Sequence, residues 1–484
     1  MNTTTRRKGS RLVAGLVAAG IGVAAALGVA TPAMAAPDSS NINPAATGSI
    51  VVHKFEQPTT QGARSTGSAL PSAQTSTLTP VSGVTFSVRR VTHATALDLT
   101  KSSTWQTLSA LTPAQVTAAG SGYSLGTAAT QVTAADGTAT FGSLPVGVYL
   151  VEETAVGAQP VALRAQPFLV SIPLPENGAW VYDVHVYPKN ALTGITLAQD
   201  TTAARALGDT VKYTVTTNVP NKQTGNPISS YVITDTLDVT QVTYASSVVR
   251  LGSTVLSAPG TATPDYTLTT DAATGLVTVT LTTAGIAKVN AAPNGSQVIL
   301  EVNATVTALG DGSIENNATV NINSTTTVRA TQVVSSWGAA RIIKYPSTNE
   351  DLRLQGAVFE VRLPGSATAI PVGTGTPRQT QFTTGENGEV VIPGLIAGSY
   401  ELVEITAPTG YQVNATPIAF TVTAGSTANA VQVKVANTQV PAFALPITGG
   451  DGQMAFMIGG GSLLVVAAGA FLIVAGRRRV EQQA

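Results

Sequence analysis

Among the side chains that could do chemistry in this chain is a lysine that directly follows a proline. Lys189 comes after Pro188, and the segment 180–187 before them contains the β-formers Val184 and Val186 at alternate positions. Proline has no N–H to donate, so it belongs at the end or edge of a strand. Taken alone, this pattern indicates a strand end with a solvated lysine. The lysine amine becomes a nucleophile only after it loses its proton.

A lysine, a glutamate and an asparagine also occur twice in the same order. The two sets are Lys54, Glu153 and Asn190, and Lys344, Glu404 and Asn437. Matching strand and turn motifs surround both sets, and the turn Asp136-Gly137 corresponds to Asn387-Gly388. Matches in this number and order indicate an internal repeat.

Other kinds of chemistry find no support in the sequence. The chain has no cysteine, which excludes disulfides, thiolate catalysis and cysteine-ligated metals. His53 and His185 are placed so that they could lie near each other on neighbouring strands, but no carboxylate spacing completes a metal site. The chain also lacks His-Glu-x-x-His, Gly-x-Ser-x-Gly and phosphate-loop motifs. We therefore expect no cofactor, no metal and no enzyme active site.

The composition is typical of an extracellular all-β protein. Charged residues make up 11% of the chain, less than half the usual quarter, and the formal net charge is +0. Seven basic residues lie in the terminal segments, together with Asp451 and Glu481. Without those segments, 26 − 7 = 19 basic and 26 − 2 = 24 acidic residues remain, a net charge of about −5. No basic patch is left to hold phosphates, so we expect no nucleic-acid partner.

The two ends of the chain have the features of processed segments. A basic start is followed by an apolar run from Leu12 to about Val29 and by Ala33-Met34-Ala35, which fits a signal-peptidase site. We expect residues 1–35 to be a signal peptide, with a retained membrane helix as the alternative.

At the other end, Leu445, Pro446, Ile447, Thr448 and Gly449 precede an uncharged run over 454–475 and three arginines at 477–479. The run is long enough to span a bilayer, and the arginines would stay on the cytoplasmic side. An isolated Leu-Pro-x-Thr-Gly would be an ordinary turn. The uncharged run and the three arginines directly behind the motif argue against an ordinary turn.

Between these ends, the chain is expected to be all-β, with tandem immunoglobulin-like or transthyretin-like sandwiches. We expect an N-terminal domain over 36–190, a middle domain over 191–333, a third domain over 334–439 and a C-terminal segment over 440–484. Strand-like alternation recurs in each domain, separated by Gly, Asn and Pro turns. The internal repeat relates the first and third domains.

Three motifs together resemble those of the backbone subunits of Gram-positive sortase-assembled pili. Residues 445–449 resemble the cell-wall sorting signal, 180–189 the pilin motif and 400–411 the E-box. The sorting signal alone is shared by many wall proteins, whereas its combination with a pilin motif is specific for polymerising subunits. The first and third domains also resemble the collagen-binding-protein B-type repeat, a transthyretin-like β-sandwich.

The resemblance implies that this protein is a sortase substrate. A sortase cysteine would attack the Thr448 carbonyl and release everything from Gly449 onward. Lys189 of another subunit would then attack the acyl-enzyme, and repetition would give a head-to-tail covalent shaft anchored to the cell wall and supporting adhesion.

Partners and location follow from the same resemblance. The implied partners are further copies of the chain, a pilus-specific class C sortase, a housekeeping sortase, minor tip and basal pilins, peptidoglycan, and a host receptor or matrix component. The protein would pass through a transient membrane intermediate to a surface fimbria. The alternative is a monomeric wall-anchored adhesin or a minor or basal pilin that does not use Lys189.

Lys344, Glu404 and Asn437 resemble a triad that forms an intramolecular isopeptide bond. Burial would lower the pKa of the lysine and favour its neutral amine. A protonated Glu404 would hydrogen-bond the Asn437 carbonyl, polarise it and shuttle protons while ammonia leaves. A buried ion pair with a satisfied asparagine is the alternative. In the first domain, the matching acid is Glu153, and a Lys54–Asn190 bond would lock the strand next to Lys189.

The middle domain departs from this pattern. Its first predicted strand, 194–199, has no lysine, and Lys212 lies one strand later, where a surface position is expected. Asp235 could be the acid, and Asn316 or Asn317 the amide. We expect no isopeptide bond in this domain.

Overall fold

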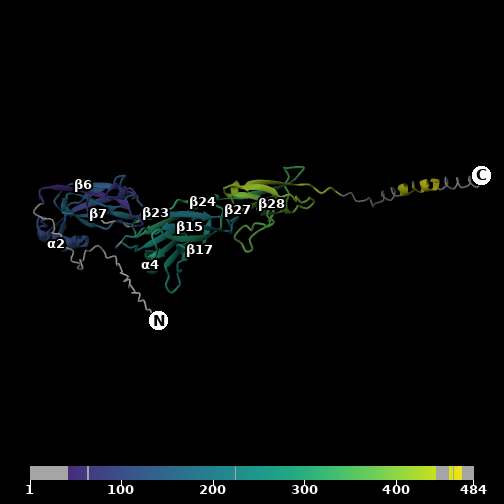
Figure 1. Ribbon diagram of the computed structural model, residues 1–484. Coiled ribbons are helices and arrows are strands. Elements are labelled where there is room, and N and C mark those ends of the chain that lie inside the picture. The colour runs from purple at the N-terminus through teal and green to yellow at the C-terminus, as the bar shows by residue number, and fades with distance from the viewer. Residues whose placement is uncertain are drawn as a thin grey trace, which may run out of the picture.

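The protein forms three β-rich domains in a row (Figure 1). The computed structural model describes residues 42–442, except 61, 63, 64 and 224, together with 457–461 and 463–470. Within these ranges, no helix is long and apolar enough to cross a membrane. The expected signal peptide and the motif at 445–449 lie outside the described residues, as do residues 454–456, 462 and 471–475 of the expected span.

The N-terminal domain packs two main sheets face to face. Its strands are β1 (Thr47–His53), β2 (Phe55–Glu56), β3 (Thr85–His93), β4 (Tyr123–Leu125), β5 (Ala129–Val132), β6 (Thr138–Pro145), β7 (Gly147–Ala155), β8 (Val161–Leu163), β9 (Phe168–Ile172), β10 (Leu174–Glu176), β11 (Ala179–Val181), β12 (Asp183–Val186) and β13 (Lys189–Leu192). Its helices are α1 (Ser72–Thr75), α2 (Ser102–Ala110) and α3 (Pro113–Thr117). One sheet has the order β12-β1-β6 and the other β4-β3-β7-β9, with β5 on β3.

The core of this domain is formed by side chains at alternate positions along its strands. Ile50 and Val52 of β1 are fully buried and belong to one cluster with Phe86 of β3 and Phe141 of β6. Their neighbours along β1 are only partly buried, as expected for a strand with one face on the core. The side strands β2, β13 and β8 form a separate small sheet at one end.

The middle domain is a second sandwich. Its strands are β14 (Ile195–Asp200), β15 (Thr210–Asn218), β16 (Tyr231–Leu237), β17 (Val242–Leu251), β18 (Thr254–Val255), β19 (Tyr266–Asp271), β20 (Leu276–Leu281), β21 (Gln297–Val306), β22 (Ser313–Ile322) and β23 (Thr326–Arg329), with one helix, α4 (Thr283–Ala291). One sheet has the order β14-β15-β21-β17-β18, and the other contains β19-β20-β16-β22 with β23. Buried and partly buried residues alternate along β15, β16 and β21, so each strand turns one face to the core.

The third domain repeats the plan of the first. Its elements are β24 (Val333–Pro346), β25 (Val358–Arg362), β26 (Phe382–Thr383), β27 (Glu389–Ile396), β28 (Gly398–Thr406), β29 (Ile418–Val422), η2 (Thr427–Asn429) and β30 (Val431–Asn437). In both domains the first strand pairs in parallel with a late strand, β1 with β12 and β24 with β30. The repeat seen in the sequence is therefore a repeat of topology.

A single long strand joins the middle and third domains. The start of β24 pairs with β22 of the middle domain, and the rest pairs with β27 and β30 of the third. Arg378 forms an ion pair with Asp209 across the joint, with 2.7 Å between Nη1 and Oδ1. Leu207 packs against Gly394 so closely that an added Cβ would lie 2.1 Å from the leucine Cγ. The shared strand and these contacts fix the two domains against each other.

Candidate functional site

Lys344, Glu404 and Asn437 meet in the interior of the third domain. Lys344 lies on β24, Asn437 is the last residue of β30, and Glu404 lies on β28 of the facing sheet. The Lys344 side chain is fully buried; its Nζ donates to the Asn437 amide oxygen and, at 3.1 Å, to the carbonyl of Val435. A carboxylate oxygen of Glu404 lies 3.5 Å from Nζ. The amine and the amide therefore touch in a dry site.

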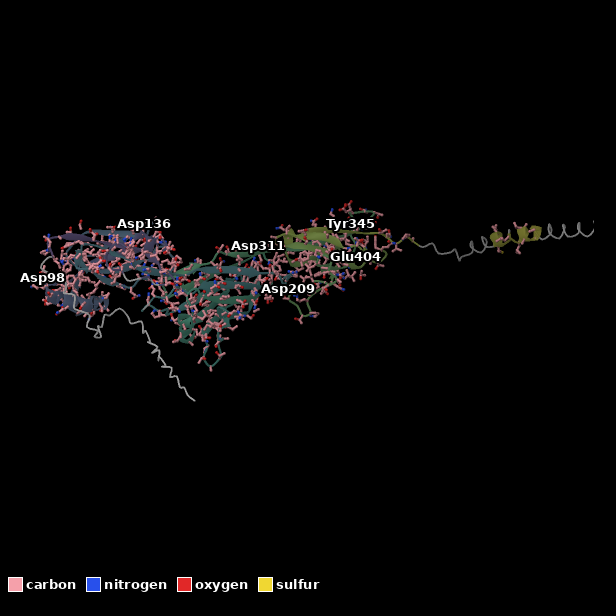
Figure 2. The ribbon with its side chains drawn as sticks, in the orientation of Figure 1. Asp98, Asp136, Asp209, Asp311, Tyr345 and Glu404 are labelled. Carbon is pink, nitrogen blue, oxygen red and sulfur yellow. The ribbon has the colours of Figure 1, made fainter. Side chains whose placement is uncertain are left out.

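Glu404 accepts a hydrogen bond from the amide nitrogen of Asn437. The sequence predicts instead that a protonated Glu404 donates to the amide oxygen. Asn437 Nδ2 donates to Glu404 Oε1 at 3.0 Å, and the backbone N–H of Asn414 donates to Oε2 at 2.7 Å. The carbonyl oxygen is occupied by the lysine instead. This position suits an acid that gives a proton to a leaving nitrogen. Figure 2 labels Glu404 within the third domain.

The first domain holds the same arrangement. Lys54 is fully buried, and its Nζ lies 2.8 Å from Glu153 Oε2 and 2.5 Å from Asn190 Oδ1. Asn190 Nδ2 donates to Glu153 Oε1 at 2.8 Å, while the Ala165 N–H donates to Asn190 Oδ1 at 2.8 Å. The Phe86 ring covers the amine, with its centroid 5.5 Å from Nζ. Every polar group of this triad has a partner.

Burial changes the protonation of both lysines. Desolvation lowers the pKa of Lys54 to about 8 and that of Lys344 to about 8, although Glu153 and Glu404 each act to raise it. At pH 7, a pKa of 8 leaves roughly a tenth of the amine neutral, against roughly one part in three thousand at the ordinary lysine pKa. Each site therefore supplies a usable nucleophile next to an amide carbon.

Lys189 begins a new strand, β13, beside this triad. Strand β12 ends at Val186, before Pro188, as the sequence predicts. The lysine is half-buried, and this burial lowers its pKa. The middle domain contributes to its setting, because Gln223 Nε2 donates to the Lys189 carbonyl at 2.9 Å. Sequence reasoning missed Gln223, which no local pattern links to Lys189.

His53 and His185 lie side by side on β1 and β12, as predicted. His53 Nε2 and His185 Nδ1 are 2.8 Å apart, and the Tyr187 ring stacks on His53 with centroids 4.7 Å apart. Burial, followed by the neighbouring His185, lowers the pKa of His53. Among the described residues, no three His, Asp or Glu side chains gather as a metal site would require. These ring contacts hold β12 and the segment that leads to Lys189 against β1.

The middle domain contains an acid and an amide without a lysine. Asp235 and Asn316 are fully buried, and Asn316 Nδ2 donates to Asp235 Oδ2 at 3.3 Å. Asn317 points outward, so Asn316 is the asparagine that faces the acid. Lys212 lies on the surface, 3.7 Å from Asp200, as the sequence predicts. Burial raises the pKa of Asp235 to about 7.

The raised pKa of Asp235 predicts a pH-dependent stability of the middle domain. The folded-state pKa lies above the unfolded value of about 4, so the stabilising effect of the neutral acid is complete below pH 4 and is lost as pH rises through 7. The loss should reach up to about 4 kcal/mol. Thermal unfolding of the protein and its Asp235→Asn variant between pH 4 and 8 measures it. The variant should lose this part of the pH slope, and equal slopes would contradict the prediction.

Two family models match the chain. The Gram-positive pilin subunit D1 N-terminal domain matches residues 45–191, which hold the Lys54 triad and Lys189. The prealbumin-like fold domain matches residues 338–438, which hold the Lys344 triad.

Relatives match along almost the full chain. A fimbrial subunit type 2 of Actinomyces naeslundii is 30% identical over 99% of this chain and 98% of its own length. A fimbrial subunit type 1 of Actinomyces viscosus is 30% identical over 99% of both. The structure is similar to that of the full-length major pilin SpaD from Corynebacterium diphtheriae, with a TM-score of 0.65, 24% identity, and coverage of 83% of this chain and 100% of that one. The chain belongs to the Gram-positive fimbrial subunits, the major pilins that build a pilus shaft.

Proposed function

We propose that this pilin is joined head to tail by an amide bond between Lys189 of one subunit and Thr448 of the next, made by a sortase. The observation that carries the proposal is the order of the two groups along a chain whose three domains lie in a row (Figure 1). Lys189 begins the last strand of the first domain, and the Leu-Pro-x-Thr-Gly motif follows the third domain. A bond between them repeats along the same axis as the domains, so it builds a fibre instead of a closed ring.

The proposed transfer uses the lysine only as a nucleophile. The sortase thiol attacks the Thr448 carbonyl carbon, the peptide bond to Gly449 breaks, and the thioester keeps Thr448. The amine of Lys189 then attacks the thioester, the new C–N bond forms, and the thiol leaves. Partial burial favours this step, because it lowers the pKa of the amine and raises its neutral fraction. The sortase that recognises the motif, and a second sortase that transfers the finished shaft to peptidoglycan, complete the proposal.

We further propose that the two buried triads form internal amide bonds without an enzyme. The neutral amine of Lys344 attacks Cγ of Asn437, the bond from Cγ to Nδ2 breaks, and ammonia leaves with a proton from Glu404. Lys54, Asn190 and Glu153 have the same roles in the first domain. The contacts of amine with amide oxygen and of acid with amide nitrogen support this assignment.

The position of the third-domain bond has a mechanical consequence. The chain enters this domain along β24 and leaves it along β30, and these two strands pair in parallel. An amide between Lys344 and Asn437 would therefore tie the entry strand to the exit strand. Tension along the fibre would cross that bond directly and leave the loop between the two residues unloaded.

Removal of the Lys189 amine tests the polymerisation proposal. In cells that express Lys189→Ala, the ladder of high-mass species in a denaturing gel of wall extract should disappear, because no acceptor amine remains. The matched control is Lys101→Ala, since the Lys101 side chain is 69% exposed in the same domain; it should keep the ladder. A ladder that persists in Lys189→Ala would favour the wall-anchored monomer or minor pilin, or a different lysine.

Intact mass tests the internal bonds. The mature protein should be lighter than its sequence by two ammonia molecules, and Glu404→Gln should be lighter by one, because the third domain no longer has its acid. The bond closes a loop with a separation of 93 residues, which corresponds to about 4–5 kcal/mol of stability. Glu404→Gln should therefore also melt at a lower temperature. A wild-type mass equal to the sequence mass would rule out both bonds.

A further inference from the structure

When the fibre is pulled, the tension passes mainly through one domain of the subunit, the middle domain. This step rests on the proposed linkage, in which force enters a subunit at Lys189 and leaves it at Thr448. Residues before Lys189 then lie outside the path. In the third domain, the Lys344–Asn437 bond would carry the load past the residues between them. What remains in the path is the middle domain, residues 190–332, together with the first part of β24 before Lys344 and the chain after Asn437.

The middle domain is pulled apart at its two ends. Force reaches its first strand, β14, and leaves through the start of β24, which pairs with β22. These strands belong to opposite sheets of the sandwich. Noncovalent contacts between the sheets therefore carry the tension, unless a bond connects β14 to β22.

The interior of the middle domain has buried polar atoms that lack hydrogen-bond partners. Among the described side chains, the buried atoms with no hydrogen-bond partner include Asp235 Oδ1, Asn316 Oδ1, Gln199 Oε1 and the Tyr213 hydroxyl. Asp235 and Asn316 bond each other, and the negative charge of Asp235 adds to burial in raising the pKa of Tyr213. Four unpartnered groups of this kind in one sandwich are costly, and a buried ammonium with three N–H donors would satisfy most of them.

Gln199 occupies the position from which a lysine would reach this cluster. It pairs with Tyr213 in the β14–β15 register, and cross-strand partners share one face of a sheet. Its Nε2 donates to the Val334 carbonyl at 2.7 Å, and Val334 neighbours Val333, the partner of Asn316 in the β22–β24 register. Gln199 therefore lies on the strand that a bond would have to connect to β22, and its side chain reaches the start of β24.

The three lysines of the middle domain are all engaged elsewhere. Lys212 pairs with Asp200, Lys222 donates to the Ala292 carbonyl, and Lys288 lies 2.6 Å from Asp265. None of them approaches the acid or the amide in the described structure. The acid and the amide are present, and the amine is not.

We infer that the middle domain is the extensible element of the pilus shaft, because its buried Asp235–Asn316 pair has no lysine partner and Gln199 stands at the inward position on β14 where closure of the domain would require one. Under tension this domain unfolds and lengthens the subunit, while the third domain keeps its length. The segment 190–332 contains 332 − 189 = 143 residues, with a contour length on the order of 500 Å.

The same geometry predicts that one substitution would let a covalent bond form between the two sheets of the domain. In Gln199→Lys, the neutral amine attacks Cγ of Asn316, the bond from Cγ to Nδ2 breaks, and ammonia leaves with a proton supplied by Asp235. The bond then bypasses residues 200–315, 315 − 199 = 116 in all, so only 143 − 116 = 27 of the middle-domain residues can still extend. The releasable length falls to about a fifth. Gln199→Met, of similar length but without an amine, is the matched control.

Single-molecule pulling tests this inference. The chain has no cysteine, so Lys189→Cys and Thr448→Cys provide two unique handles on the mature subunit. The wild type and Gln199→Met should each release about 143 residues in one event. Gln199→Lys should release about a fifth of that length, and its intact mass should be one ammonia below that of a protein with the same sequence and no third bond.

Two results would overturn the inference. One is a wild-type subunit whose middle domain does not extend, with a mass three ammonia molecules below the sequence mass, because the domain would then be closed already. The other is a Gln199→Lys protein that folds, as judged by its own extension in a single event like that of the control, yet keeps the full released length and loses no further ammonia. An additional release of the loop between Lys344 and Asn437 would instead contradict the proposed third-domain bond and leave the middle-domain assignment intact.

Discussion

The structure depends on a buried lysine amine held against an asparagine amide between the first and last strands of a domain. Taking an ammonium ion and a carboxylate out of water costs several kcal/mol for each ion, even when they pair. Both triads are nevertheless dry, with Lys54 and Lys344 fully buried. Conversion of amine and amide into an uncharged amide removes the buried charge and replaces an expensive ion pair with a covalent bond. The same burial that makes the triad costly would therefore favour the proposed reaction.

The proposed internal bonds would give covalent ties to a protein that has no cysteine. A disulfide would need two cysteines and an oxidising environment, whereas the amide needs only a dry cavity and three side chains. In the third domain, the parallel pairing of β24 with β30 brings the lysine and the asparagine together at one end of the sheet. In the first domain, Asn190 follows Lys189 directly, so the residue proposed to join subunits is next to the residue proposed to lock the domain. Figure 2 shows Asp136 in the first domain and Glu404 in the third, well apart along the row of domains.

Much of this arrangement could be predicted from the sequence. Period-two alternation and the internal repeat predict the sandwiches, and the order of lysine, acid and amide predicts the two triads, since topology is repeated along with motif. The sequence could not distinguish Asn316 from Asn317, because which of two neighbours faces inward depends on the register of β22. Nor could it show that Glu404 bonds the amide nitrogen, that Gln223 of the middle domain donates to the Lys189 carbonyl, or that Gln199 donates to the Val334 carbonyl. These are contacts between elements far apart in the chain, and no local pattern records them.

The central claim concerns two covalent bonds that use different lysines, and peptide mapping of purified fimbriae tests both together. Proteolysis followed by tandem mass spectrometry should yield a branched peptide in which the side chain of Lys189 carries the Thr448 carbonyl, and a second in which Lys344 is joined to Asn437 with loss of ammonia. Recovery of the peptide with a free Lys189 amine as the dominant species in assembled fimbriae would contradict the account.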